Sequence, residues 1–62
     1  MIEADHELEA RVKQVQDLFQ EKVRGASQRY FDECSIHARG LIAQILSGKN
    51  PDITGGWPHT SN

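Results

Sequence analysis

Residues 24–27 (RGAS) constrain the fold of this chain most strongly, because they separate two segments that each carry apolar side chains at helical spacing. Gly25 readily takes the left-handed conformation that closes a helix, and Ser27 is a favourable cap for the start of the next one. Such a short connection forces two helices to run antiparallel and side by side. The sequence therefore predicts an all-α fold built on a helical hairpin.

The two predicted helices differ in the width of their apolar stripes. In the first helix, about 5–24, the stripe is narrow and consists of Leu8, Val12, Val15, Phe19 and Val23. In the second helix, about 27–47, it covers nearly half of the circumference and consists of Tyr30, Phe31, Cys34, His37, Ala38, Leu41, Ile42, Ile45 and Leu46. A stripe this wide needs more than one neighbour, so we expect these residues of the second helix to form a dimer or partner interface as well as a core.

The hairpin is expected to span residues 1–47, with Asp5 as the cap of its first helix. Two other arrangements stay open: one continuous helix over 5–47 that tolerates Gly25 at a cost of about 1 kcal/mol, or a break at 32–35 instead. The charged residues Glu9 and Lys13 are spaced like an exposed ion pair on the first helix.

Residues 48–62 form a different kind of segment, rich in Gly, Pro, Asn, Thr and Ser, and are expected to be an extended or flexible tail. Gly48 and Pro51 end the second helix. The large apolar side chains of the tail are Ile53 and Trp57. Three interpretations stay open: the tail folds back so that Trp57 covers an end of the bundle, it is disordered, or Ile53 and Trp57 anchor it to a partner.

The length of the chain limits the stability of a lone hairpin. With 62 residues it forms one small domain, and its single cysteine allows no internal disulfide. Self-association is the remaining common remedy for a small core. We therefore expect two copies to form a twofold four-helix bundle, in which the surplus apolar width of the second helix meets the other copy: Phe31, Ala38, Ile42 and Leu46.

Charge and hydropathy argue against several classes of partner. The formal net charge is −2 and the basic residues are dispersed along the chain, which argues against nucleic acid as the main partner. The longest apolar run, 41–43, is far shorter than the roughly 20 residues that span a bilayer, so no membrane partner is expected. A free cysteine and an N-terminus without the pattern of a secretion signal favour a cytoplasmic location.

Cys34 and His37 form the one pair with possible metal or redox chemistry, because they lie one helical turn apart. Two copies of the pair across a twofold axis would complete a four-ligand set, but packing is the favoured interpretation for a cysteine within an apolar stripe. No catalytic motif or phosphate loop is present in the sequence. We therefore expect no enzyme activity, no cofactor and no small-molecule substrate.

The leading functional hypothesis is a small cytoplasmic protein–protein interaction module, an adaptor or inhibitor that pairs with itself and binds a larger protein. The alternative is a metal- or redox-responsive helical dimer that uses Cys34 and His37. A DNA-binding regulator is the third hypothesis and is disfavoured by the charge distribution.

Overall fold

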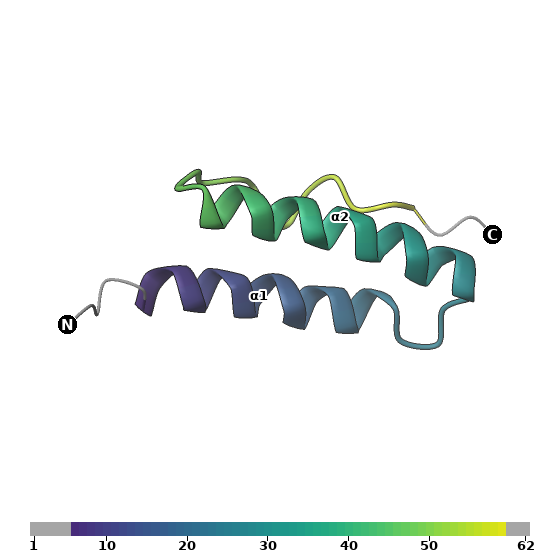
Figure 1. Cartoon of the computed structure of the whole chain (residues 1–62). Helices are drawn as coiled ribbons and strands as arrows, with labels where there is room; N and C mark the ends of the chain where they lie inside the picture. Colours follow the sequence, from purple (N-terminus) through teal and green to yellow (C-terminus); the bar gives the residue numbers. More distant parts are fainter. Residues whose placement is uncertain (1–5, 60–62) are drawn as a thin grey trace.

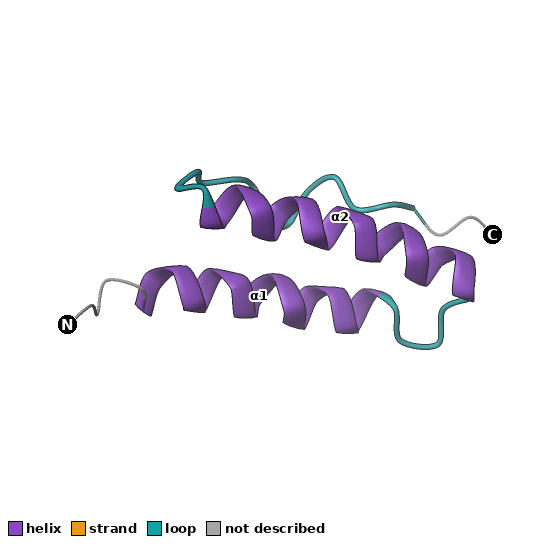
Figure 2. Cartoon of the chain, viewed as in Figure 1, coloured by secondary structure: helices purple, strands orange, loops and turns teal. Residues whose placement is uncertain are grey.

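The computed structural model describes residues 6–59, which form two antiparallel helices and a tail (Figure 1). Helix α1 spans His6–Lys22 and helix α2 spans Gln28–Leu46. Figure 2 shows that residues 6–59 form only helices, turns and loops. The all-α helical hairpin predicted from the sequence is confirmed, with each helix ending within about two residues of the expected position. The predicted cap at Asp5 lies outside the described residues.

The break between the helices lies at the predicted hinge. Gly25 takes a positive φ of 72°, and Ala26 donates its backbone N–H to the carbonyl of Val23. Ser27 has an extended backbone, and its hydroxyl accepts the backbone N–H of Tyr30 at 3.3 Å. These stop and start signals lie next to each other, which excludes the continuous helix and the later break.

The end of α2 turns the chain back on itself. Gly48 has a φ of 91°, and the backbone N–H of Lys49 donates to the carbonyl of Gln44 at 2.9 Å. The tail then returns along α2 toward the hinge, so that residues near its end lie close to the start of α2 (Figure 1). The tail is therefore a third packed segment of the fold.

The core of the hairpin joins all three segments. Val15 of α1 and Cys34 and Ile45 of α2 are fully buried, and Trp57 of the tail is only 7% exposed. The complete set of buried apolar residues is Val15, Cys34, Ala38, Leu41, Ile45 and Trp57. Most of this set comes from α2, as the width of its apolar stripe predicted. Part of that stripe is covered by the tail of the same chain.

Candidate functional site: the uncovered flank of the hairpin

The side of the hairpin that carries Tyr30 and His37 is covered by the tail, and we call it the covered flank. The Tyr30 hydroxyl donates to the carbonyl of Pro58 at 2.9 Å, and the His37 ring lies 3.1 Å from the carbonyl of Gly55. Arg11 of α1 donates to the side chain of Asn50, near the start of the tail. Polar contacts from both helices therefore hold the tail along its length.

Trp57 is the apolar centre of the covered flank. Its ring meets His37 edge to face, with ring centroids 4.6 Å apart. The indole N–H donates to the carbonyl of Ile53 at 2.9 Å, so that the buried ring keeps a hydrogen-bond partner within the tail. Because a carbonyl only accepts hydrogen bonds, the His37 Nε2 carries the hydrogen that faces Gly55. The His37 ring is thus held by one hydrogen bond and one aromatic contact.

Two turns in the tail set its path. Asp52 accepts the backbone N–H of Thr54 at 3.1 Å and the Thr54 hydroxyl at 2.8 Å, and these bonds lower the pKa of the Asp52 carboxyl. Gly56 has a φ of 80°, and a Cβ added there would lie 3.0 Å from the His37 ring. Only glycine therefore fits this bend beside His37 without strain or displacement.

The opposite side of the hairpin has no such cover, and we call it the open flank. Phe19 of α1 contacts Phe31 of α2 across it, with centroids 5.1 Å apart and an interplanar angle of 64°. Helical periodicity places further apolar residues of both helices on this side, next to the residues of the core. The open flank consists of Val12, Phe19, Val23, Phe31, Ile42 and Leu46.

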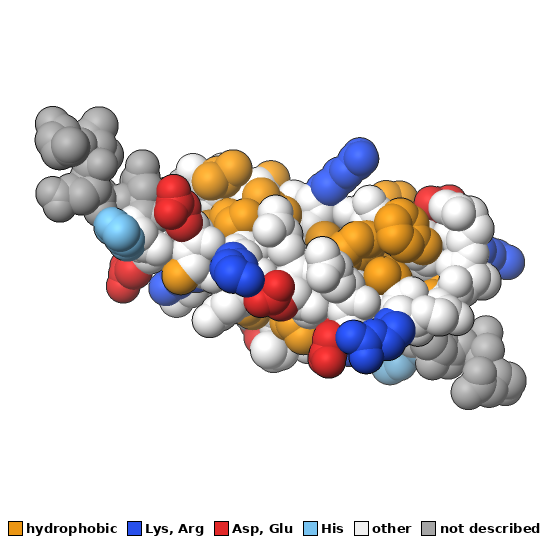
Figure 3. Space-filling model, turned by 90° about the horizontal axis from the view of Figure 1, so that it is seen from below, with side chains coloured by type: hydrophobic (Ala, Val, Ile, Leu, Met, Phe, Trp, Pro, Cys, Tyr) orange, Lys and Arg blue, Asp and Glu red, His pale blue; other side chains and the backbone are white. Residues whose placement is uncertain are grey.

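Several of these side chains are accessible to solvent. Phe31 is 40% exposed and Leu46 is 63% exposed, whereas the other four are partly buried. Figure 3, which views the molecule from the side of α1, shows exposed hydrophobic side chains gathered toward both ends of the hairpin. Ile36 is also exposed, at 70%, but periodicity puts it on the outer face of α2, away from the flank. It is therefore a lone exposed residue of the kind that most surfaces carry.

The residues of α2 expected at the interface fall into three groups. Cys34, Ala38, Leu41 and Ile45 are buried within the chain, and Tyr30 and His37 bind the tail. Phe31, Ile42 and Leu46 belong to the open flank. Ile53 and Trp57, the expected anchor of the tail, pack against the core of their own chain. No local pattern of residues indicates this last contact, because the tail meets α2 only after the chain has reversed.

The structure gives Cys34 and His37 separate roles in packing. Cys34 is fully buried in the core, while His37 turns toward Gly55 and Trp57. The Cys34 thiol also lies beside the Tyr30 hydroxyl. The pKa of Tyr30 is raised, first because its hydroxyl is partly buried and second because of this thiol. Within residues 6–59, no group of three or more His, Cys, Asp or Glu side chains gathers in a way that suits a metal ion.

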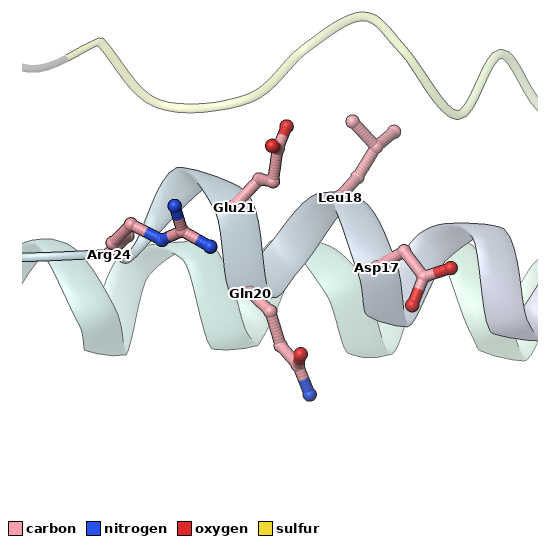
Figure 4. A pocket seen from close by; sticks show the side chains of 5 residues that line it. All are labelled: Asp17, Leu18, Gln20, Glu21 and Arg24. Carbon is pink, nitrogen blue, oxygen red and sulfur yellow. The ribbon is translucent and has the colours of Figure 1, made fainter.

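A shallow depression lies on the outer side of α1 near its C-terminal end. Its volume is about 360 Å³, and it is lined by Asp17, Leu18, Gln20, Glu21 and Arg24. These side chains point in different directions: Leu18 and Glu21 toward the tail, and Gln20 away from it (Figure 4). They do not converge on a common point, as the polar groups of a ligand site do. We therefore place the candidate site on the open flank.

Comparisons of the sequence with models of protein families, with curated proteins and with solved structures find no match. Neither α1 nor α2, the helices of the described region, is long and apolar enough to cross a membrane. The surface of the hairpin itself is therefore the feature from which a function can be inferred.

Proposed function

We propose that this chain is a protein–protein interaction module that works as a homodimer. Two hairpins join along their open flanks to form a four-helix bundle, with both tails on the outside. The observation that carries this proposal is the difference between the flanks: the tail covers the apolar side chains on one side, while Phe31 and Leu46 stay 40% and 63% exposed on the other.

The size of these side chains sets the free energy that a dimer interface would gain from their burial. Complete burial of a Leu- or Phe-sized side chain contributes roughly 1.5–3 kcal/mol, and in a symmetric dimer each contact occurs twice. A chain of 62 residues supplies a small core by itself, so additional burial at a dimer interface would be a large part of its total stability. In this proposal the dimer is an adaptor or inhibitor whose outer surfaces occupy a site on a larger cytoplasmic protein.

Sedimentation equilibrium on the purified chain tests the proposal. We expect a dimer at micromolar concentration. The variant Leu46→Gln should raise the Kd of the dimer at least tenfold, because the substitution removes burial in both copies and each step of about 1.4 kcal/mol corresponds to that factor. The change should barely affect the folding of the separated chain, since Leu46 is largely exposed there.

The chain offers a matched control for this variant. Ile36 is as exposed as Leu46 and lies on the same helix, but on the face away from the open flank. Ile36→Gln should therefore leave the Kd unchanged. A wild-type chain that stays monomeric up to high micromolar concentration, or equal effects of the two substitutions, would contradict the proposed dimer.

A further inference from the structure

The tail lies on the covered flank in the way that an extended peptide lies on a receptor. Figure 2 shows it as an irregular segment that runs alongside α2. Among the described residues, no backbone–backbone hydrogen bond joins 50–59 to either helix. The helices instead supply side-chain donors, from Tyr30 to the carbonyl of Pro58 and from His37 to the carbonyl of Gly55. Both contacts involve the main chain of the tail, so a segment with other side chains could form them as well.

One side chain of the tail is its apolar anchor. The ring of Trp57 is 7% exposed and meets His37 edge to face, whereas Ile53 is only partly buried against the core. A buried aromatic residue at the centre of a contact surface is a common anchor in protein recognition. The glycine before it, Gly56, lets the segment bend beside His37. The covered flank thus accepts a glycine followed by a tryptophan.

Contacts inside the tail help to set the shape in which it binds. The indole N–H of Trp57 donates to the carbonyl of Ile53, and Asp52 accepts two hydrogen bonds from Thr54. None of these bonds needs a group from either helix. A separate segment with the same residues can therefore form them itself, which lowers the entropy cost of its binding.

Arg11 marks a place where the tail is not the best ligand for this flank. Its guanidinium donates to the neutral side chain of Asn50. A carboxylate in that place would give a charge-assisted hydrogen bond, which is roughly twice as strong. The carboxylates nearest to this contact in sequence, Glu7 and Asp52, form no ion pair with Arg11, because the ion pairs of residues 6–59 lie elsewhere. Lys49, beside Asn50, adds a second positive charge.

From these contacts we infer that the covered flank is a binding site for an extended segment of another protein, and that the chain's own tail occupies it as an internal competitor. The segment carries glycine and tryptophan in the places of Gly56 and Trp57, and Asp or Glu in the place of Asn50.

The tail of a second copy is not the occupant that we infer. It carries the same Asn50, so it has no advantage over a tethered tail whose local concentration is roughly millimolar. A segment with a carboxylate there gains a contact with Arg11 that neither tail makes. This inference rests on the proposed role as an interaction module and names its surface and ligand. It does not depend on the dimer, which uses the opposite flank.

Binding of a synthetic peptide to the full chain tests this inference. The probe is a fluorescently labelled peptide with the sequence of residues 49–59. The receptor is the variant Gly56→Ala, whose own tail is strained at a φ of 80°. We expect saturable binding by fluorescence anisotropy. Binding to the wild-type chain should be about tenfold weaker, because its unstrained tail competes better by roughly that factor.

Two altered peptides test the parts of the ligand. The peptide that carries Trp57→Ala should lose binding, because its anchor is gone. The peptide that carries Asn50→Asp should bind about threefold to tenfold more tightly than the unaltered one. This gain should disappear when the receptor also carries Arg11→Gln, which identifies Arg11 as its source.

The full-length variant Trp57→Ala gives a second measurement that does not need a folded receptor. Its helical circular dichroism should recover as the unaltered peptide is added, because the peptide returns the missing indole ring to the core. The peptide that carries Trp57→Ala is the control and should give no recovery.

The outcomes keep this inference separate from the proposed dimer. Absence of binding to Gly56→Ala at roughly millimolar peptide, with no recovery of the Trp57→Ala chain, would overturn the binding site. Equal binding of the peptide that carries Trp57→Ala would do the same. Equal affinities of the Asn50→Asp and unaltered peptides would overturn the choice of an acidic foreign segment. None of these results alters the sedimentation of the wild-type chain, which alone decides the dimer.

Discussion

The two flanks of the hairpin begin from the same apolar stripe of α2 and end in different states. On the covered flank, Tyr30 and His37 are bonded to the tail, and Trp57 is 7% exposed. On the open flank, Phe31 and Leu46 keep 40% and 63% of their surface in water. Two helices are too few to enclose a stripe this wide, and the chain itself supplies a third neighbour on one side only.

The difference also separates two kinds of stability. Contacts on the covered flank belong to the folded chain, so their loss should lower the free energy of unfolding at any protein concentration. Contacts on the open flank belong, in our proposal, to association, so their loss should matter only where dimers form. Substitutions on each flank can therefore test this division.

The variant Trp57→Ala should lower the free energy of unfolding by about 3–5 kcal/mol, because it removes the largest side chain of the core. A small domain has about this much stability in total, so most of the chain should unfold. Thermal unfolding followed by circular dichroism measures the change.

Leu46→Ala is the control from the open flank. Measured at a concentration too low for dimers, it should change the free energy of unfolding by about 0.5 kcal/mol or less, because Leu46 is 63% exposed. If Trp57→Ala left the unfolding curve unchanged, the tail would not be part of the core, and the two flanks would be equivalent.

The variant Gly56→Ala should have an intermediate effect and act through the tail alone. The positive φ of 80° costs a non-glycine residue about 1–2 kcal/mol, and the new methyl group would press on His37. We expect the tail to loosen while the helices persist. The fluorescence of Trp57, the single tryptophan, should shift to longer wavelength.

Gly48→Ala separates the two causes of this effect. Gly48 also has a positive φ, of 91°, but a Cβ added there meets nothing within 4 Å. It should therefore show the cost of backbone strain without the collision with His37. Equal effects of the two variants on the Trp57 emission would argue against close packing between Gly56 and His37.

Alkaline pH should produce the smallest effect, again on the covered flank. Partial burial and the Cys34 thiol raise the pKa of Tyr30, so the folded chain favours the neutral hydroxyl that donates to Pro58. This contribution is fully present below the pKa of an unfolded tyrosine, about 10, and is lost as the pH rises through the higher folded value. Tyrosinate absorbance of the single tyrosine should therefore rise together with a change in Trp57 emission.

The variant Tyr30→Phe provides the reference for this titration. Lysines also lose their charge near this pH, and the variant keeps that background while removing the ionising hydroxyl. Its Trp57 emission should change less with pH than that of the wild type. Identical alkaline transitions in the two proteins would show that the bond to Pro58 does not help to hold the tail.

Features set by neighbouring residues could be predicted from the sequence. The turn at Gly25, the cap at Ser27 and the end of α2 at Gly48 depend on backbone preferences and hydrogen bonds within a few residues. The burial of Leu41 and Ile45 followed from the spacing of the stripe. The predicted pair Glu9–Lys13 was wrong, because Lys13 has a second carboxylate within reach in Asp17 and pairs with it.

The position of the tail could not be predicted in the same way. Gly, Pro and Thr in residues 48–59 show that the segment is not a helix, but Trp57 has no periodic neighbours that would assign it to a surface. Its contact with His37 joins residues that are far apart in the chain. Similarly, the sequence indicated that the stripe of α2 was too wide for α1, but not which side of it the tail would leave exposed.

Local sequence is sufficient to specify the two helices, their reversal at Gly25 and the excess apolar width of α2, because these depend on backbone preferences and on the helical period. The packing of the tail beside Tyr30 and His37, which leaves Phe31 and Leu46 accessible, depends instead on contacts between distant parts of the chain. The core against which Trp57 packs contains residues of both helices and forms only once they have paired, so no short stretch of the chain encodes this contact.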